Sequence, residues 1–157
     1  MIEVEIEDAA WSAALPEATA LVERAATAAL GRVEGDLVVL LTDNATVGDL
    51  NSRFRDKDGP TNVLSFPAAE MTIPGHSPHL GDLVLAYGIC AEEAAAQGKT
   101  LSNHLSHLTV HGVLHLLGRD HMAEDEAEAM EAEERSILAS LGVPDPYRPD
   151  DGSCSDA

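Results

Sequence analysis

Hydrophobic and polar residues alternate with two different periods along the chain, and the shorter period predicts the strands. Between residues 2 and 6, apolar side chains alternate with glutamates, which is typical of a strand with one buried face. Residues 37–41 are continuously apolar, as expected of a strand covered on both faces. Further strands are predicted at 61–66 and 80–87, where the connecting loop permits antiparallel pairing. We therefore expect a small mixed sheet of about four strands.

The longer period, close to that of a helix, fills the segments between and after these strands. Helices are predicted at 16–30, 46–54, 88–97, 101–117 and 123–141. The first of them joins the first two strands, and such a crossover favours their parallel pairing. The elements together predict an α+β fold.

The helix that begins near Leu101 is apolar on most of its circumference. At about 100° per residue, its four histidines fall within a sector of about 80°, and they are His104, His107, His111 and His115. A helix this apolar belongs in the middle of a domain. We therefore predict a central helix with one histidine-lined face open to a cleft.

Length and composition fit one domain. The chain has 157 residues, of which 45% are hydrophobic. We expect a single domain over residues 1–147 and a disordered acidic tail over 148–157, which is rich in Pro, Asp, Ser and Gly. Two cysteines give no disulfide framework, and no apolar run approaches the roughly 20 residues that cross a membrane. With no leader-like N-terminus, the expected location is the cytoplasm.

The formal net charge of -19 argues against a nucleic-acid partner, because phosphate binding draws on lysine and arginine. The charge is uneven, however, since seven of the 28 acidic residues lie between Glu124 and Glu134. Three of the nine basic residues, Arg53, Arg55 and Lys57, fall within five positions. This group either faces phosphate or forms ordinary salt bridges with neighbouring acids, and the spacing alone favours neither.

The histidines near the end of the central helix have the spacing of a metal site. His111 and His115 are one helical turn apart, so their rings can share one ion. At Gly118 the helix can end in a left-handed glycine and return His121 to the same ion. Three nitrogen ligands with a vacant fourth position are typical of catalytic zinc.

The same histidine spacing occurs in zinc peptidases, which need one further residue. In those enzymes the glutamate after the first histidine is the general base. Here Gly112 stands at that position, so the peptidase hypothesis loses its base while the metal site is retained. Asp120 or Asp82 remains as a candidate base.

Four separate motifs follow one another along the chain. They are Arg55-Asp56-Lys57, Thr61-Asn62-Val63-Leu64-Ser65-Phe66-Pro67, Leu80-Gly81-Asp82, and His111-Gly112-Val113-Leu114-His115-Leu116-Leu117-Gly118-Arg119-Asp120-His121. Together they resemble the YbeY family of bacterial endoribonucleases. The resemblance implies a single α+β domain with a small mixed sheet and a central metal-bearing helix.

The resemblance further implies a zinc-dependent, single-strand-specific endoribonuclease. Its expected roles are maturation of small-subunit ribosomal RNA and ribosome quality control, so the expected partners are single-stranded RNA and the small subunit or its assembly factors. By position, the implied zinc ligands are His111, His115 and His121, and Arg55 is the basic residue required for activity. One departure is Arg119, where the family commonly shows an aromatic residue.

Four more residues are candidates for supporting the metal or binding substrate, namely Asp120, His107, Asp82 and Lys57. Two alternative functions stay open at this point. One is a zinc peptidase or amidohydrolase that uses Asp120 or Asp82 as base. The other is a noncatalytic ribosome-assembly factor with a structural zinc, for which His107 would be a fourth ligand. The sequence carries no indication of the oligomeric state.

Overall fold

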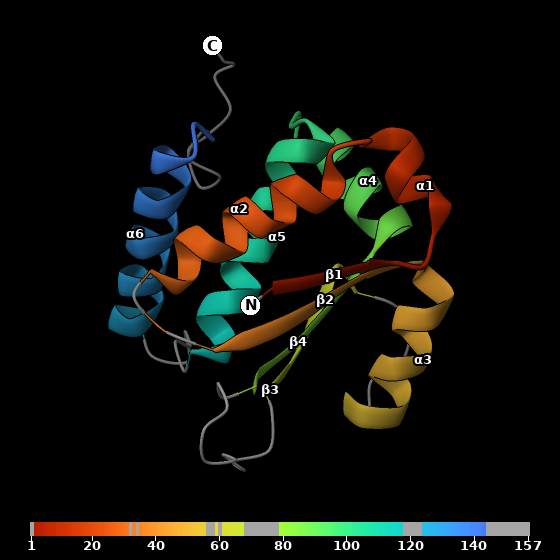
Figure 1. The fold of residues 1–157 in the computed structure, drawn as a ribbon, viewed down its shortest axis with the longest axis horizontal. Coiled ribbons are helices and arrows are strands. Elements are labelled where there is room, and N and C mark those ends of the chain that lie inside the picture. Colours follow the sequence, from red (N-terminus) through yellow and green to blue (C-terminus); the bar gives the residue numbers. More distant parts are fainter. Residues whose placement is uncertain are drawn as a thin grey trace.

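The computed structural model describes residues 2–31, 33, 35–55, 59, 61–67, 79–117 and 124–143. In these ranges the strands are β1 (Ile2–Ile6), β2 (Asp36–Thr42), β3 (Val63–Pro67) and β4 (His79–Ala86). The helices are α1 (Ala9–Ala14), α2 (Ala18–Leu30), α3 (Asn44–Arg55), α4 (Tyr87–Ala96), α5 (Leu101–Leu116) and α6 (Glu124–Ser140). The predicted α+β fold with a four-stranded sheet is confirmed (Figure 1).

The sheet is mixed, with the strand order β1-β2-β4-β3. Strands β1, β2 and β4 run parallel, and β3 pairs antiparallel with β4 at one edge. The parallel pairing of the first two strands and the antiparallel pairing of the last two were both predicted. Each follows from the connection, because a helix between strands makes a crossover and a loop permits a hairpin.

Helices α2 and α5 cover one face of this sheet, and α3 lies against the other (Figure 1). Leu37, Val39 and Leu41 of β2 are buried in the main core beneath α2 and α5. Val38 and Leu40, which alternate with them, are only partly buried. The prediction that both faces of this strand are covered was therefore wrong for the second face, because the short α3 shields only part of it.

Helix α1 was not predicted, because its six residues are too few to display a helical period. It begins after Asp8, whose carboxylate accepts a hydrogen bond from the Ala10 amide at 2.9 Å. The indole of Trp11 is fully buried and donates to the Thr42 carbonyl at 3.0 Å. The buried Trp11 side chain therefore holds α1 against the end of β2.

Two other helices start at positions that differ from the predicted ones. Pro16 precedes α2 instead of lying in its first turn. Helix α3 begins before Thr46, because Asp43 accepts a hydrogen bond from the Thr46 amide at 2.7 Å and caps the helix. The predicted glycine at the end of α2 is confirmed, since Gly31 has a φ of 59°.

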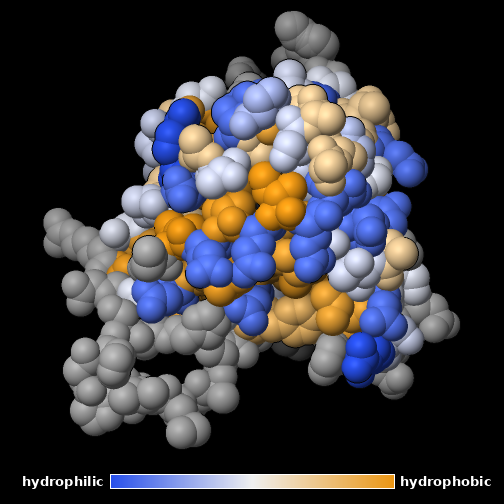
Figure 2. Space-filling view, turned by 45° about the vertical axis from the view of Figure 1, so that its right-hand side comes forward, coloured by the Kyte–Doolittle hydropathy of each residue, from blue (hydrophilic) through white to orange (hydrophobic). Residues whose placement is uncertain are grey.

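The surface is not uniformly polar. Figure 2 shows a band of hydrophobic residues interrupted by hydrophilic ones on one face. Among the large hydrophobic side chains that the structure describes, only Val33 is classed as exposed, so partly buried residues also reach the surface. None of the helices within the described ranges has the length and apolar character of a membrane span.

Candidate metal centre

Helix α5 carries the histidines and occupies the centre of the fold, as predicted. The side chain of Thr100 caps its first turn by accepting from the Asn103 amide at 3.1 Å. Leu105, Val113 and Leu114 are fully buried in the main core. Their burial fixes the rotation of α5 about its axis, so the histidine stripe is held on one defined side of the helix.

The histidine stripe is not an open cleft along its whole length, which corrects the prediction. The exposed fraction of the side chains rises from 3% at His104 through 14% at His107 to 24% at His111. The inner two histidines bind carboxylates of neighbouring helices, Glu93 of α4 and Glu134 of α6. Only the C-terminal end of the stripe therefore approaches solvent.

Consecutive rings of the stripe contact each other edge to face. The ring centroids of His107 and His111 are 6.2 Å apart, and those of His111 and His115 are 4.9 Å apart. The structure thus brings His111 and His115 together, as their spacing predicted. His121, Asp120 and Lys57 lie outside the described residues.

The carboxylate of Glu134 is the feature of this centre that the sequence reasoning missed. It is fully buried between α5 and α6, and each of its oxygens meets a different histidine. Oε1 lies 2.9 Å from His107 Nε2, and Oε2 lies 3.0 Å from His111 Nδ1. An ionised carboxylate is costly to bury unless donors satisfy it, and here two imidazoles do so.

A signal for Glu134 was present in the sequence. Met130 and Leu138 lie four residues before and after it, and both are buried. Positions four apart share one helix face, so Glu134 interrupts an apolar stripe. Seven acids lie between Glu124 and Glu134, so the acidic pattern by itself does not distinguish this buried carboxylate from the others.

The donor set in this region suits a transition metal. Ligand atoms of His107, His111 and Glu134 lie within 4.8 Å of one another, so this group could hold a metal ion. Imidazole nitrogens and carboxylate oxygens are the ligands that zinc takes besides thiolates. Cys90 lies in the main core, where burial raises the pKa of its thiol to about 12, and it is not part of this group of ligand atoms.

The other candidate residues are placed as follows. Arg55 is the last residue of α3, and only its backbone is described. Arg53, two residues earlier, pairs with Asp49 at 3.4 Å on the exposed surface, which supports the salt-bridge alternative for this residue.

Asp82 lies on the sheet face opposite to α5. It lines a hollow together with Leu40, Phe66 and Val84, and the next residue, Leu83, which also borders the hollow, has its side chain buried in the main core. Side chains alternate between the two faces of a strand, so Asp82 and the histidine stripe are on different sides of the sheet. This placement argues against Asp82 as a base beside a metal held by α5.

A polar network behind the histidines ties the start of β3 to α4 and α5. Glu93 Oε1 accepts from Asn62 Nδ2 and from His104 Nε2, each at 3.0 Å. The Asn62 carbonyl in turn accepts from the Ala86 amide at 3.1 Å. Because Asn62 follows the segment that contains Arg55 and Lys57, the network anchors the far end of that segment.

The network predicts a pH dependence of stability. Burial holds the pKa of His104 below its ordinary value, so the unfolded chain binds its proton more tightly than the folded chain does. Stability is then fully present above the unfolded pKa of about 6.5 and falls as the pH drops below it. We expect metal-free His104→Gln to lose less free energy of unfolding than the unmodified protein between about pH 7 and about pH 5. Urea unfolding measures both slopes, and equal slopes would contradict the assignment to His104.

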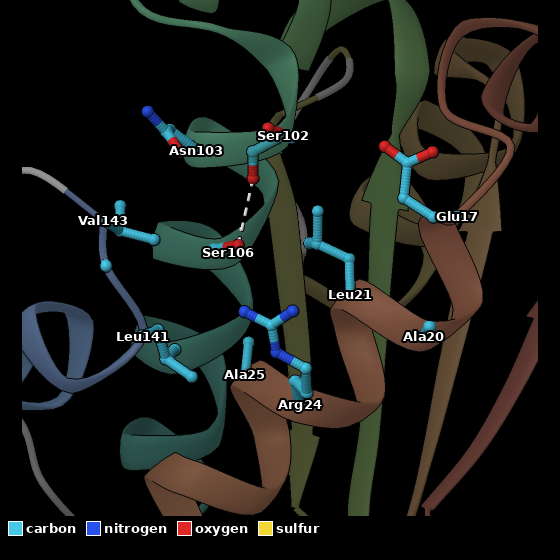
Figure 3. Close-up of a pocket in the computed structure, with 11 residues that line it drawn as sticks. Glu17, Ala20, Leu21, Arg24, Ala25, Ser102, Asn103, Ser106, Leu141 and Val143 are labelled. Atoms are coloured by element: carbon cyan, nitrogen blue, oxygen red, sulfur yellow. Dashed lines mark hydrogen bonds between the residues drawn. The ribbon is translucent and has the colours of Figure 1, made fainter.

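A second hollow lies on another side of α5, between α2 and the end of α6 (Figure 3). Arg24 and Asn103 are among its polar lining residues, and Leu21 is among its apolar ones. Ser106 also lines it and donates its hydroxyl hydrogen to the Ser102 carbonyl at 3.0 Å. No histidine is among the lining residues, so this hollow is separate from the metal centre.

Comparison with known proteins places these features in a family context. The family model described as Endoribonuclease YbeY matches residues 3–142. An Endoribonuclease YbeY of Paramagnetospirillum magneticum is 50% identical over 155 residues, covering 93% of this chain and 94% of the relative. One of Azorhizobium caulinodans is 51% identical over 152 residues, covering 93% and 95%. A solution structure from Thermotoga maritima shares the fold, with a TM-score of 0.55 at 23% identity, over 98% of this chain and 99% of that one.

Proposed function

This chain belongs to the YbeY family of endoribonucleases, and we propose that it cuts single-stranded RNA at a zinc ion held by His111, His115 and His121. As a family member it is an endoribonuclease and hence a hydrolase. The observation that carries the metal proposal is the contact between the His111 and His115 rings, at a centroid distance of 4.9 Å. These rings lie at the more exposed end of the histidine stripe, where a substrate can approach.

The residues present fit a zinc ion with an open coordination position. Zinc, when bound, supplies Lewis-acid polarisation of a phosphoryl oxygen and a water of lowered pKa. His111 and His115 provide neutral nitrogen ligands from one helix face, and His121 is proposed as the third. The sequence leaves two nucleophiles open, water and the 2′-hydroxyl of the RNA itself.

Arg55 is proposed as the residue that stabilises charge on the phosphate. Negative charge builds on the nonbridging oxygens as a phosphodiester is cleaved, and a guanidinium can pair with two of them at once. Arg55 ends α3, shortly before the Asn62 anchor described above. Lys57 and Asp120 are proposed to contact substrate or support the metal.

The proposed cellular role is maturation of small-subunit ribosomal RNA and ribosome quality control in the cytoplasm. One domain over residues 1–147 is proposed to carry the activity. An endoribonuclease acts on RNA, and the chain's net charge of -19 favours help from a basic partner in holding it. The small ribosomal subunit or its assembly factors are the proposed partners.

The peptidase alternative is disfavoured by the packing of Gly112. A Cβ at this position would lie 2.7 Å from Leu83 Cδ2, so the position of the peptidase glutamate faces the sheet. Of the two candidate bases, Asp82 lies on the other face of the sheet, so this alternative has only Asp120 left as its base.

The structural-zinc alternative is favoured by one observation, the group formed by His107, His111 and Glu134. An ion held there by these three and a further protein ligand would have no open position for substrate. Metal content and cleavage in variants of each candidate ligand separate this alternative from the proposal.

Arg55→Ala tests the proposal together with metal analysis. We expect the unmodified protein to hold about one zinc per chain and to cut single-stranded RNA but not an unstructured protein. Arg55→Ala should keep its zinc and lose cleavage by at least about a hundredfold, because the phosphate charge is no longer paired.

The matched control is Arg53→Ala, which removes the same charge two residues away at an exposed salt bridge. It should retain both zinc and cleavage. RNA cleavage by the metal-free protein, or by Arg55→Ala at the unmodified rate, would overturn the proposal.

A further inference from the structure

We propose that Glu134 is a positioning residue of the zinc site, which sets the ring orientation and tautomer of His111 without binding the ion itself. This inference rests on the proposed function, because it takes His111 as a zinc ligand. It concerns a residue on α6, a helix that contributes no histidine to the site among its described residues.

The burial of Glu134 is the first step. Its side chain is 1% exposed, and the buried Met130 and Leu138 lie on the same face of α6. A carboxylate in such a place is stable only while its donors stay in position. The two hydrogen bonds therefore hold the Glu134 carboxylate and both imidazoles in fixed positions relative to one another.

The tautomer of His111 is the second step. A neutral imidazole that donates from Nδ1 carries its lone pair on Nε2, which is the atom that can ligate a metal. Glu134 Oε2, 3.0 Å from Nδ1, accepts this proton and stabilises that tautomer. Histidine ligands of metal sites commonly donate their second nitrogen to a carboxylate in this way.

His107 completes the arrangement from the other side. Its Nε2 lies 2.9 Å from Glu134 Oε1, so both oxygens of the carboxylate are held and its plane is fixed. His107 is thereby assigned to the support of Glu134.

The observed distances favour support over direct ligation. The Glu134 oxygens lie 2.9 and 3.0 Å from the histidine nitrogens, which are hydrogen-bond distances. Two ligands of one tetrahedral zinc, each about 2.0–2.1 Å from it, lie about 3.3 Å apart and share no proton. His111 and Glu134 are thus placed as hydrogen-bond donor and acceptor, respectively, rather than as two ligands of one ion.

Glu134→Gln tests the inference, because glutamine keeps the shape and removes the charge. Zinc affinity is measured by competition with a chromogenic chelator, and the ligand set is followed by the absorption spectrum of the cobalt(II) form. We expect affinity to fall about 10- to 100-fold while the shape of the cobalt spectrum is unchanged. Thermal unfolding in chelator tests whether the variant is folded.

The matched control is Glu128→Gln, an exposed position on the same helix, which should bind zinc within about twofold of the unmodified protein. Unchanged affinity in Glu134→Gln would overturn the inference and leave Glu134 with a role in packing alone. Loss of all zinc with a changed cobalt spectrum would overturn it in favour of Glu134 as a ligand. If Glu134→Gln does not fold, Glu134→Asp replaces it in the test. Aspartate keeps the charge on a shorter side chain, and zinc affinity is again expected to fall about 10- to 100-fold.

Failure of the proposed function has a different signature. If His115 is not a zinc ligand, His115→Ala binds zinc with the affinity of the unmodified protein, whatever the zinc affinity of Glu134→Gln. If His115→Ala loses zinc and Glu134→Gln does not, only the positioning role is wrong.

Discussion

Replacing His115 with alanine is expected to abolish both zinc retention and RNA cleavage. The proposed site has three nitrogen ligands, and removing one leaves two, which hold zinc poorly. Loss of the metal removes several kcal/mol of stabilisation from the transition state, so cleavage should fall by about a thousandfold or more. Metal analysis after dialysis and a single-stranded RNA cleavage assay measure the two losses.

Two companion variants make this result specific. His104 lies on the same stripe of α5 and forms a hydrogen bond with Glu93. The His104→Gln variant should therefore keep its zinc and its RNA cleavage activity. His107→Ala distinguishes the two candidate groups of ligands. If the ion is bound by His107, His111 and Glu134, this variant loses zinc while His115→Ala keeps it, which would contradict the proposed ligand set.

The parts of the fold that could be predicted from the sequence are those governed by short-range periodicity. Alternation over residues 2–6 indicated a strand with one buried face, and in β1, at the edge of the sheet, the apolar side chains are partly buried and the alternating glutamates exposed. The apolar circumference of the helix near Leu101 predicted a central α5, and it is buried there. The contact between His111 and His115 was predictable because one helical turn separates them by covalent geometry.

The missed features depend on contacts between segments far apart in the chain. Glu134 lies 27 residues from His107, and no local pattern indicates that α6 packs the Glu134 carboxylate against the histidine stripe. The same contact explains why the stripe is covered rather than open at His107. Helix α1 was missed for a related reason, because the burial of Trp11 and its bond to Thr42 hold it in place.

The position of Gly112 links the fold to the choice of chemistry. Helix α5 approaches β4 so closely that a Cβ on Gly112 would lie 2.7 Å from the fully buried Leu83 side chain. A glutamate here would have to displace the buried Leu83 side chain or move the helix away from the sheet. The absence of the peptidase base is therefore matched by the packing of this domain as well as being a chemical difference.

Gly112→Glu is accordingly expected to leave the domain largely unfolded. The substitution forces a longer side chain and a charge into a packed interface, and these effects together cost more than about 4 kcal/mol. Gly112→Ala should be milder, because overpacking of about 1–3 kcal/mol is partly offset by about 1 kcal/mol of helix propensity. Soluble yield and urea unfolding measure both variants.

The cause of this destabilisation can be isolated with two further variants. Ala139→Glu places the same side chain at an exposed position of α6 and should change stability by less than about 0.5 kcal/mol. Leu83→Ala removes the atoms that Gly112→Ala would meet, so the double variant should be less destabilised than the sum of the single ones. Additive effects would mean that the two side chains do not collide and that α5 tolerates a residue larger than glycine at this position. A soluble, fully stable Gly112→Glu would reopen the possibility of a base beside His111, because the side chain would then have found a path away from the sheet.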